Sequence, residues 1–292
     1  MENRLITFKN YKDEDYELVI NFLIELNKKD DSHINWNWAR FEWMYEHPEF
    51  NKELKPYIGM WFDKEKLVGL VAFDMYFGEV SCLVLPEFDY LYKDLVKYSW
   101  ENLKDENGLG ISINDESEKE IEVLKSLGFE KAEACETIMT IDLDKEFEVK
   151  LPDDLKIVEV DQHKDYQRLS WLFWQGFGHG DNKEECEEVN DVEYNGRVHF
   201  NPHLSLAAEN KDGDFASFAG LWYHPDTDYA YVEPVCTIPS YRGKGIAKAL
   251  IYEELNRARS MGAKKAYVIS DQEFYKKLGF KIEQKHTFWW KK

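Results

Sequence analysis

The stretch YAYVEPVCTIPSYRGKGIAKAL, residues 229–250, predicts a strand, a glycine-containing turn and a helix in succession. Residues 229–237 are rich in β-branched and aromatic side chains, which favour an extended strand. Pro234 has no amide proton to give to a ladder, so it marks an edge, a bulge or a splayed strand pair. A splay at this point leaves the amides of Val235, Cys236 and Thr237 available to a ligand.

The turn that follows the strand has the properties of an anion site. Gly243 and Gly245 stand where the chain enters the helix, and glycine lets a ligand approach the backbone closely. The first amides of a helix have no partner within it, so they suit a phosphate. Arg242, Lys244 and Lys248 add positive charge. The alternative is a basic turn that merely begins a helix, and the spacing of a Walker P-loop is absent.

The helix after the turn has one apolar stripe, with Gly262 just beyond it as the expected C′ residue. The stripe consists of Ala247, Leu250, Ile251, Leu255 and Ala258.

Arg242-Gly-Lys-Gly245-Ile-Ala247 resembles the Arg/Gln-x-x-Gly-x-Gly/Ala signature of the GNAT family of acyl-CoA N-acyltransferases. The flanks are similar as well. A strand ending in Val-Glu-Pro-Val-x-Thr precedes the signature, and Phe274-Tyr-Lys-Lys-Leu-Gly-Phe280 follows it after one expected helix and strand. The resemblance covers the C-terminal half of the chain. It implies a fold in which a mixed, mostly antiparallel sheet is flanked by helices.

Composition limits the classes of partner. The chain has 292 residues, 43% of them hydrophobic, which predicts a globular protein of two domains. Its formal charge of −20 disfavours nucleic acid and anionic membranes as partners. There is no secretory signal pattern and no apolar run long enough for a membrane span. The four widely spaced cysteines indicate a reduced, cytoplasmic protein without a zinc site.

The chain reads as two similar halves, and we place the boundary in the charged, aperiodic segment 142–154. The predicted domains are residues 1–148 and 149–292, each an α/β (α+β) GNAT-like fold. Gly128-Phe129 and Gly279-Phe280 are 151 residues apart, and Gly69 and Gly220 have the same spacing. This agreement, with the matching order of elements, indicates a tandem repeat.

The first half lacks the donor signature. In the register of the repeat, Leu91, Tyr92 and Asp94 stand where Arg242, Gly243 and Gly245 stand in the second half. A carboxylate in place of a glycine has the wrong charge and shape for a pyrophosphate. We therefore expect a degenerate N-terminal domain without a donor site.

The resemblance implies how the donor is held. The pyrophosphate of acetyl-CoA is expected on the amides of the signature loop, and pantetheine on the strand end, where the Val235 amide polarises the thioester carbonyl. Family members often contact pantetheine with an asparagine that is Val268 here, so Ser270 or Asp271 is the candidate substitute. The expected donor-binding residues are Val235, Cys236, Thr237, Arg242, Gly243, Lys244, Gly245, Ile246 and Ala247.

Acyl transfer to an amine also needs a base and an acid. Tyr275 corresponds to the family tyrosine that protonates the departing sulfur, although a buried packing role is the alternative. Glu233 is the preferred general base because it lies on the donor-holding strand, and His179 in a glycine-rich loop is the rival. Trp174 and Phe177 are either core residues or, with His179, walls of the acceptor site.

The expected function is acetyl-CoA-dependent N-acetylation of a primary amine by direct attack, carried out by the C-terminal domain without a metal. The alternatives are a non-catalytic CoA-binding or CoA-sensing protein, and a tandem-GNAT transferase that uses a longer acyl or an aminoacyl donor. The sequence leaves open the identity of the amine and the choice between a monomer and a homodimer.

Overall fold

The computed structural model describes residues 5–47, 50–189 and 197–292. The chain divides into two compact units, each described here by itself. Unit 1 comprises Met1–Ile138, Ile269–Asp271 and Ile282–Lys292, and unit 2 comprises Met139–Val268 and Gln272–Lys281.

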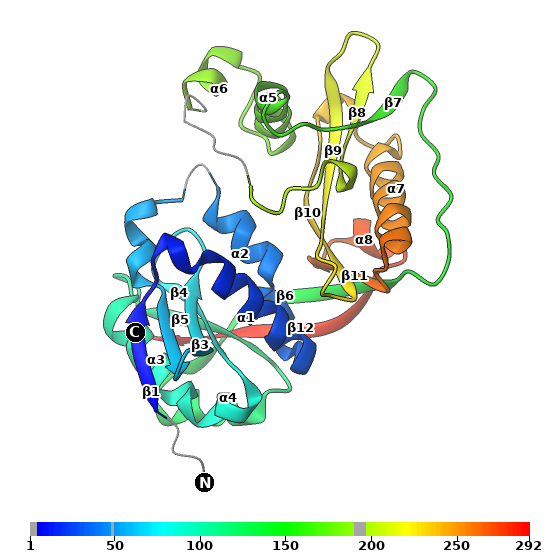
Figure 1. The fold of residues 1–292 in the computed structure, drawn as a ribbon. Helices are drawn as coiled ribbons and strands as arrows, with labels where there is room; N and C mark the ends of the chain where they lie inside the picture. Colours follow the sequence, from blue (N-terminus) through cyan, green and yellow to red (C-terminus); the bar gives the residue numbers. More distant parts are fainter. Residues whose placement is uncertain (1–4, 48–49, 190–196) are drawn as a thin grey trace. The chain divides into compact units, whose positions relative to one another are not determined.

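Unit 1 is a twisted sheet with helices packed on it (Figure 1). Its strands follow the order β1-β2-β3-β4-β5-β12, antiparallel except for the parallel pair β4–β5. The strands are β1 (Ile6–Asn10), β2 (Gly59–Asp63), β3 (Lys66–Phe73), β4 (Glu79–Val84), β5 (Leu109–Asn114) and β12 (Lys281–Lys291). The helices are α1 (Tyr16–Lys29), α2 (Trp38–Tyr45), α3 (Tyr92–Asn102) and α4 (Glu118–Ser126).

Unit 2 repeats this plan with the sheet order β11-β10-β9-β8-β7, in which β10–β11 is the parallel pair. The strands are β7 (Leu155–Glu159), β8 (Ser205–Asn210), β9 (Phe215–Tyr223), β10 (Tyr229–Thr237) and β11 (Lys265–Ile269). The helices are α5 (Tyr166–Gly176), α6 (Lys183–Val189), α7 (Ile246–Met261) and α8 (Glu273–Leu278). Short 3-10 turns precede several strands and helices of both units.

Both units place one strand, two helices, three antiparallel strands, a helix, a parallel strand and a further helix in the same order. The predicted fold class, two tandem α/β domains with mostly antiparallel sheets, is confirmed. Sequence pattern did not reveal α6, a short acidic helix whose only buried residue among 183–188 is Cys186.

The boundaries of the units differ from the predicted division at 148/149. The last strand of the chain, β12, pairs with β5 of unit 1, with Trp289 opposite Ile111. The strand β6 (Glu130–Asp142) has its first residues in unit 1 and residues from Met139 onward in unit 2. Met139 and Ile141 are buried in the core of unit 2. Each half of the sequence therefore supplies its final strand, wholly or partly, to the other unit.

Helices cover both faces of the sheet in unit 2, with α5 and α7 on opposite sides of β8–β10 in Figure 1. Neighbouring residues of a strand point to opposite faces. Accordingly, Ala207 and Phe218 pack with α5, whereas Ala208 and Ala219 pack with α7.

The buried face of α7 differs from the predicted apolar stripe: Ala247 is only half-buried, Ile246 and Ala249 are buried, and one charged residue is buried as well. Leu250, Ile251, Leu255 and Ala258 are buried as expected, and Gly262 ends the helix with φ +115°. Glu254 is fully buried among them, and its Oε1 accepts the Leu206 amide at 3.2 Å. Burial raises the pKa of Glu254 well above its ordinary value.

Candidate functional site

A bulge interrupts β10 where the sequence places Pro234. Val232 pairs with Leu221 and Val235 with Ala219, so Glu233 and Pro234 together oppose the single residue Gly220. Two residues against one is the definition of a β-bulge. The Glu233–Pro234 peptide bond is cis. The irregularity predicted from Pro234 is confirmed.

Two residues of β9 fit the backbone of this bulge. The Trp222 indole Nε1 donates a hydrogen bond to the Glu233 carbonyl oxygen at 2.7 Å. A Cβ on Gly220 would lie 2.7 Å from the same oxygen, a distance that real Cβ atoms essentially never show. Glycine at position 220 is therefore required by close approach of backbone to backbone rather than by its own φ angle.

Beyond the bulge, β10 leaves its parallel neighbour. The pairing with β11 covers Tyr229 to Tyr231 only, whereas the pairing with β9 continues to Thr237. The Ile238 amide donates to the carbonyl of Ala216 in β9. Alternate residues of a strand direct their amides to the same side, so those of Val235 and Thr237 point away from β9, toward the side that β11 has left.

The loop between β10 and α7 contains two left-handed glycines. Gly243 has φ +76° and Gly245, the N-cap of α7, has φ +79°. An added Cβ would meet no atom within 4 Å at either position. The backbone conformation therefore demands glycine, and the space beside it is open to a ligand. The amides of the first turn of α7, from Ile246, lack helical partners.

The Arg242 guanidinium lies against backbone rather than in the open loop. Its Nε donates to the Thr237 carbonyl at 3.0 Å and its Nη2 to the Gly176 carbonyl at 2.7 Å. Arg242 thus ties the end of β10 to the end of α5. The other cations of the loop, Lys244 and Lys248, place their Nζ atoms 4.6 and 5.0 Å from the ring centroids of Tyr241 and Tyr252.

Cys236 is a packing residue. Its side chain is buried, and a Cβ on Gly176 would lie 2.9 Å from its Sγ atom. Burial raises the pKa of the Cys236 thiol to about 12. A thiol with that pKa is protonated at neutral pH and is a poor nucleophile.

The acid and base candidates influence one another. Tyr275 on α8 is 8% exposed and packs with Phe274 and Phe280. Burial, with a smaller contribution from the Glu233 carboxylate, raises the pKa of Tyr275. Glu233 is half-buried and its Oε2 accepts a short hydrogen bond from the Tyr231 hydroxyl. A raised pKa keeps the phenol protonated, as a proton donor requires.

The residues expected at the acceptor site lie at the end of α5 and in the loop after it. The Trp174 and His179 rings have centroids 5.0 Å apart, and the His179 amide donates to the Trp174 carbonyl. Phe177 is 54% exposed and contacts Phe173. These side chains form local pairs, and Gly176 between them is the point at which α5 touches β10.

The structure places a small hollow beside Glu233 that sequence reasoning missed. Its volume is about 10 Å³. Arg197 and His199 line it together with Trp222, Glu233 and Pro234. The Arg197 guanidinium carbon lies 5.7 Å from the centroid of the Trp222 ring. Neither Arg197 nor His199 belongs to a periodic segment or a recognisable motif, so no sequence signal marks them.

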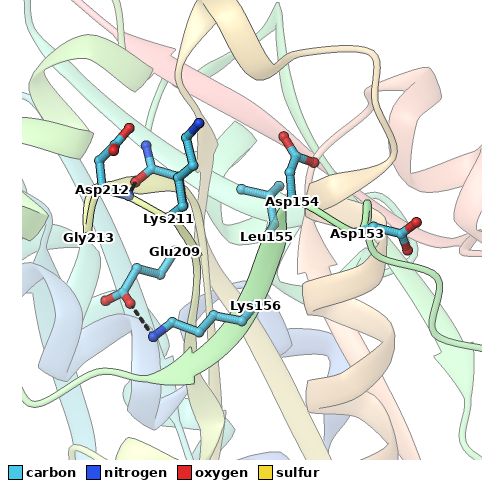
Figure 2. A pocket seen from close by; sticks show the side chains of 9 residues that line it. Asp153, Asp154, Leu155, Lys156, Glu209, Lys211, Asp212 and Gly213 are labelled. Atoms are coloured by element: carbon cyan, nitrogen blue, oxygen red, sulfur yellow. Dashed lines mark hydrogen bonds and ion pairs between the residues drawn. The ribbon is translucent and has the colours of Figure 1, made fainter.

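A larger hollow of about 510 Å³ lies elsewhere in unit 2, beside β7 and the β8–β9 hairpin (Figure 2). Two of its charges are paired: Lys156 binds Glu209 at 2.6 Å, and Glu209 also binds Arg168. Asp153, Asp154 and Asp212 add exposed negative charge. This open, acidic surface has none of the features of the β10 site.

The corresponding loop of unit 1 is built differently. Leu91 and Tyr92 are buried and right-handed helical, and Asp94 is exposed in the first turn of α3. No left-handed residue exposes amides there, since the positive-φ residues of the described chain fall outside 79–107.

Unit 1 does contain a half-buried ion pair, between Arg40 and Glu136, with a nitrogen–oxygen distance of 2.8 Å. Asn35 and Ser112 donate to the second oxygen of Glu136, so protein groups satisfy the whole carboxylate.

Within residues 5–47, 50–189 and 197–292, no group of histidine, cysteine or acidic side chains has a metal-binding arrangement. No helix of the same ranges is long and apolar enough to cross a bilayer.

The bulged strand, the glycine loop and the helix after it all lie in a part of the chain that matches a known family. Residues 166–280 match the model of the Acetyltransferase (GNAT) family. This part of the chain is therefore similar to that family. The match contains the signature loop, Glu233 and Tyr275.

One curated relative is the glucosamine 6-phosphate N-acetyltransferase of Trypanosoma brucei brucei, 40% identical over 58 residues. The alignment covers 19% of this chain and 40% of that protein.

Solved structures extend the similarity from residues 166–280 to nearly the full chain. A tandem GNAT protein from the clavulanic acid biosynthesis pathway matches with a TM-score of 0.63 and 12% identity, over 98% of each chain. A GCN5-related N-acetyltransferase from Sphaerobacter thermophilus gives a TM-score of 0.59 and 14% identity, over 98% of this chain and 95% of that one. At these identities the likeness concerns the fold, and it supports two GNAT-like domains.

Proposed function

We propose that unit 2 is an acetyl-CoA-dependent N-acetyltransferase that acts on a primary amine by direct attack. The observation that carries the proposal is the pairing of two open backbone surfaces: the strand end at Val235–Thr237, and the left-handed glycine loop at the start of α7. The match of residues 166–280 to the model of a family of acetyltransferases supports it.

The backbone suits a CoA thioester. The Val235 and Thr237 amides, directed away from β9, would hold pantetheine and polarise the thioester carbonyl. The amides of residues 243–247 and the positive end of the α7 dipole would hold the pyrophosphate. Arg242 would contribute through its two carbonyl contacts, by fixing the loop to β10 and α5.

Glu233 and Tyr275 would move the protons. Glu233 stands at the bulge, where it can accept a proton from the amine that attacks the thioester carbon. The protonated Tyr275 phenol would donate to sulfur as the carbon–sulfur bond breaks. We prefer Glu233 to His179 as the base because Glu233 lies on the donor-holding strand and its charge reaches Tyr275, whereas His179 stacks on Trp174.

Calorimetry of acetyl-CoA binding tests the donor site. We expect one site per chain in the wild type. Gly245→Asp should weaken binding at least tenfold because a negative charge then faces the pyrophosphate. Gly245→Asn is the matched control: asparagine tolerates the left-handed conformation and carries no charge, so it should retain most of the affinity.

Turnover separates the remaining functions. A panel of spermidine, lysine, kanamycin and glucosamine 6-phosphate, with acetyl-CoA and longer acyl-CoA donors, reports on acceptor and donor class. Tyr275→Phe should lower kcat about a hundredfold with unchanged acetyl-CoA affinity. Absence of binding overturns the proposal. Binding without turnover of any amine, and no effect of Tyr275→Phe, indicates a CoA-binding protein instead.

A further inference from the structure

We propose that Tyr231 and Trp222 are positioning residues that hold Glu233 for proton transfer, Tyr231 through the carboxylate and Trp222 through the backbone. The inference rests on the proposed function, because it assigns the support of the base in that reaction. Neither residue belongs to the donor signature.

Tyr231 is placed to hold the carboxylate. It lies two residues before Glu233 on β10, its side chain is only 1% exposed, and its hydroxyl donates to Glu233 Oε2. In β9, Trp222 is its direct cross-strand partner. A buried ring that is packed in a sheet has one orientation, so its hydroxyl fixes the carboxylate against one side of the bulge.

Trp222 holds the same residue from the other end. Its indole donates to the Glu233 carbonyl at 2.7 Å, and Gly220 leaves the space that this carbonyl needs. The hydrogen bond from Trp222 and the space at Gly220 together stabilise this position of the Glu233 carbonyl. The carboxylate and the carbonyl of Glu233 are therefore fixed by two different aromatic donors.

The charges around Glu233 determine what the Tyr231 hydrogen bond does. Besides Tyr231 on β10, Tyr275 on α8 interacts with the charge of the Glu233 carboxylate. Arg197 and His199 line the small hollow beside Glu233. A hydrogen bond donated to a carboxylate favours its ionised form. Tyr231 thus helps to keep Glu233 deprotonated and ready to accept a proton despite its partial burial.

The proton balance is closed by these groups. The amine nitrogen bonds to the thioester carbon and gives a proton to Glu233, while the carbon–sulfur bond breaks and Tyr275 gives its proton to sulfur. The proton on Glu233 then returns to the Tyr275 phenolate through solvent. The products are the amide and the free thiol, and both side chains recover their starting state.

The first test needs no acceptor. Carbon-13 NMR of the side-chain carboxyls follows the titration of Glu233, assigned by its absence in Glu233→Gln. Tyr231→Phe should move this titration to higher pH by about one unit, since one hydrogen bond to the charged form is lost. Trp222→Phe should leave the midpoint in place, because the indole contacts the carbonyl. Tyr223→Phe is the control: it removes a tyrosine hydroxyl from the neighbouring strand β9 that donates to the Met261 carbonyl at the end of α7.

The second test uses the pH profile of kcat/KM with the best amine of the panel. Tyr231→Phe should move the acid limb of the kcat/KM profile to higher pH, by the same amount as the Glu233 titration moves in the NMR experiment. Trp222→Phe should instead lower kcat at every pH. In the Glu233→Gln background, Tyr231→Phe should cause no further loss.

Four outcomes overturn the inference. One is an unmoved Glu233 midpoint in Tyr231→Phe; another is a profile indistinguishable from Tyr223→Phe; the third is a full additional loss in the Glu233→Gln background. If Glu233→Gln itself retains the wild-type kcat/KM and the acid limb of its pH profile, Glu233 is not the base and the inference fails. Acetyl-CoA binding and wild-type turnover would still support the proposed function in that case.

Discussion

Gly220 lacks a side chain, and this absence leaves room for the backbone of the neighbouring strand. Its φ is compatible with any residue, and its importance comes from the Glu233 carbonyl, which a Cβ would meet at 2.7 Å. The corresponding residue of the first half, Gly69, would place a Cβ 3.4 Å from Leu95 and Trp61 side-chain atoms, an ordinary contact. Glycine is therefore required at position 220, whereas position 69 has room for a Cβ.

Gly220→Ala should lower the free energy of unfolding of unit 2 by about 1–3 kcal/mol, the usual cost of overpacking a well-packed site. It should also lower kcat, because the carbonyl that is displaced belongs to Glu233. Gly69→Ala is the matched control and should cost less. Chemical denaturation and steady-state kinetics measure both effects. An equal loss of stability in the two variants, with kcat unchanged, would contradict the assignment.

At the scale of the element, the loop before α7 does two jobs with adjacent residues. Gly243 and Gly245 present open backbone, while Arg242 reaches back to the carbonyls of Thr237 and Gly176. The end of α5 is therefore attached to β10, and the close contact of Gly176 with Cys236 reinforces the attachment. A shift of this loop would move α5 and β10 together.

Arg242→Gln should release the end of α5. We expect faster amide exchange in residues 172–180 and a destabilisation of about 1 kcal/mol, with little change along α7, because the guanidinium donors to both carbonyls are lost. Lys244→Gln removes a positive charge from the same loop and leaves those contacts intact. Hydrogen–deuterium exchange compares the two. Equal effects would mean that charge, rather than hydrogen bonding, fixes the loop.

At the scale of the whole molecule, the two halves of the sequence are not the two compact units. β12 follows the β10–α7 loop in the chain but belongs to the sheet of unit 1, where His286, Thr287 and Trp289 are buried. A fragment that ends at residue 148 lacks this strand. Each compact unit therefore contains residues from both halves of the sequence.

Trp289→Ala should destabilise unit 1 by about 3–5 kcal/mol, the usual cost of truncating a buried tryptophan. Amide protection should fall in β5 and β4, whereas α7 should keep its protection and acetyl-CoA its affinity. Lys285→Ala, at an exposed position of the same strand, is the control. Loss of protection in α7 with β5 intact would show that β12 stabilises unit 2 instead.

The sequence by itself determined the features that depend on local backbone conformation. Gly243 and Gly245 require positive φ, Pro234 cannot join a ladder, and Gly262 ends a helix, so their positions follow from residue type. The fold class followed from the resemblance of the signature and its flanks to a known family, together with the matching order of elements in the two halves.

Only the tertiary structure decided the contacts between residues distant in the chain. The Trp222 contact with Glu233, the carbonyl partners of Arg242 and the burial of Glu254 depend on which strands and helices become neighbours. The exchange of β12 depends on it as well. Pairing of distant segments is selected by the packing of the whole core, and no short stretch of sequence contains that information.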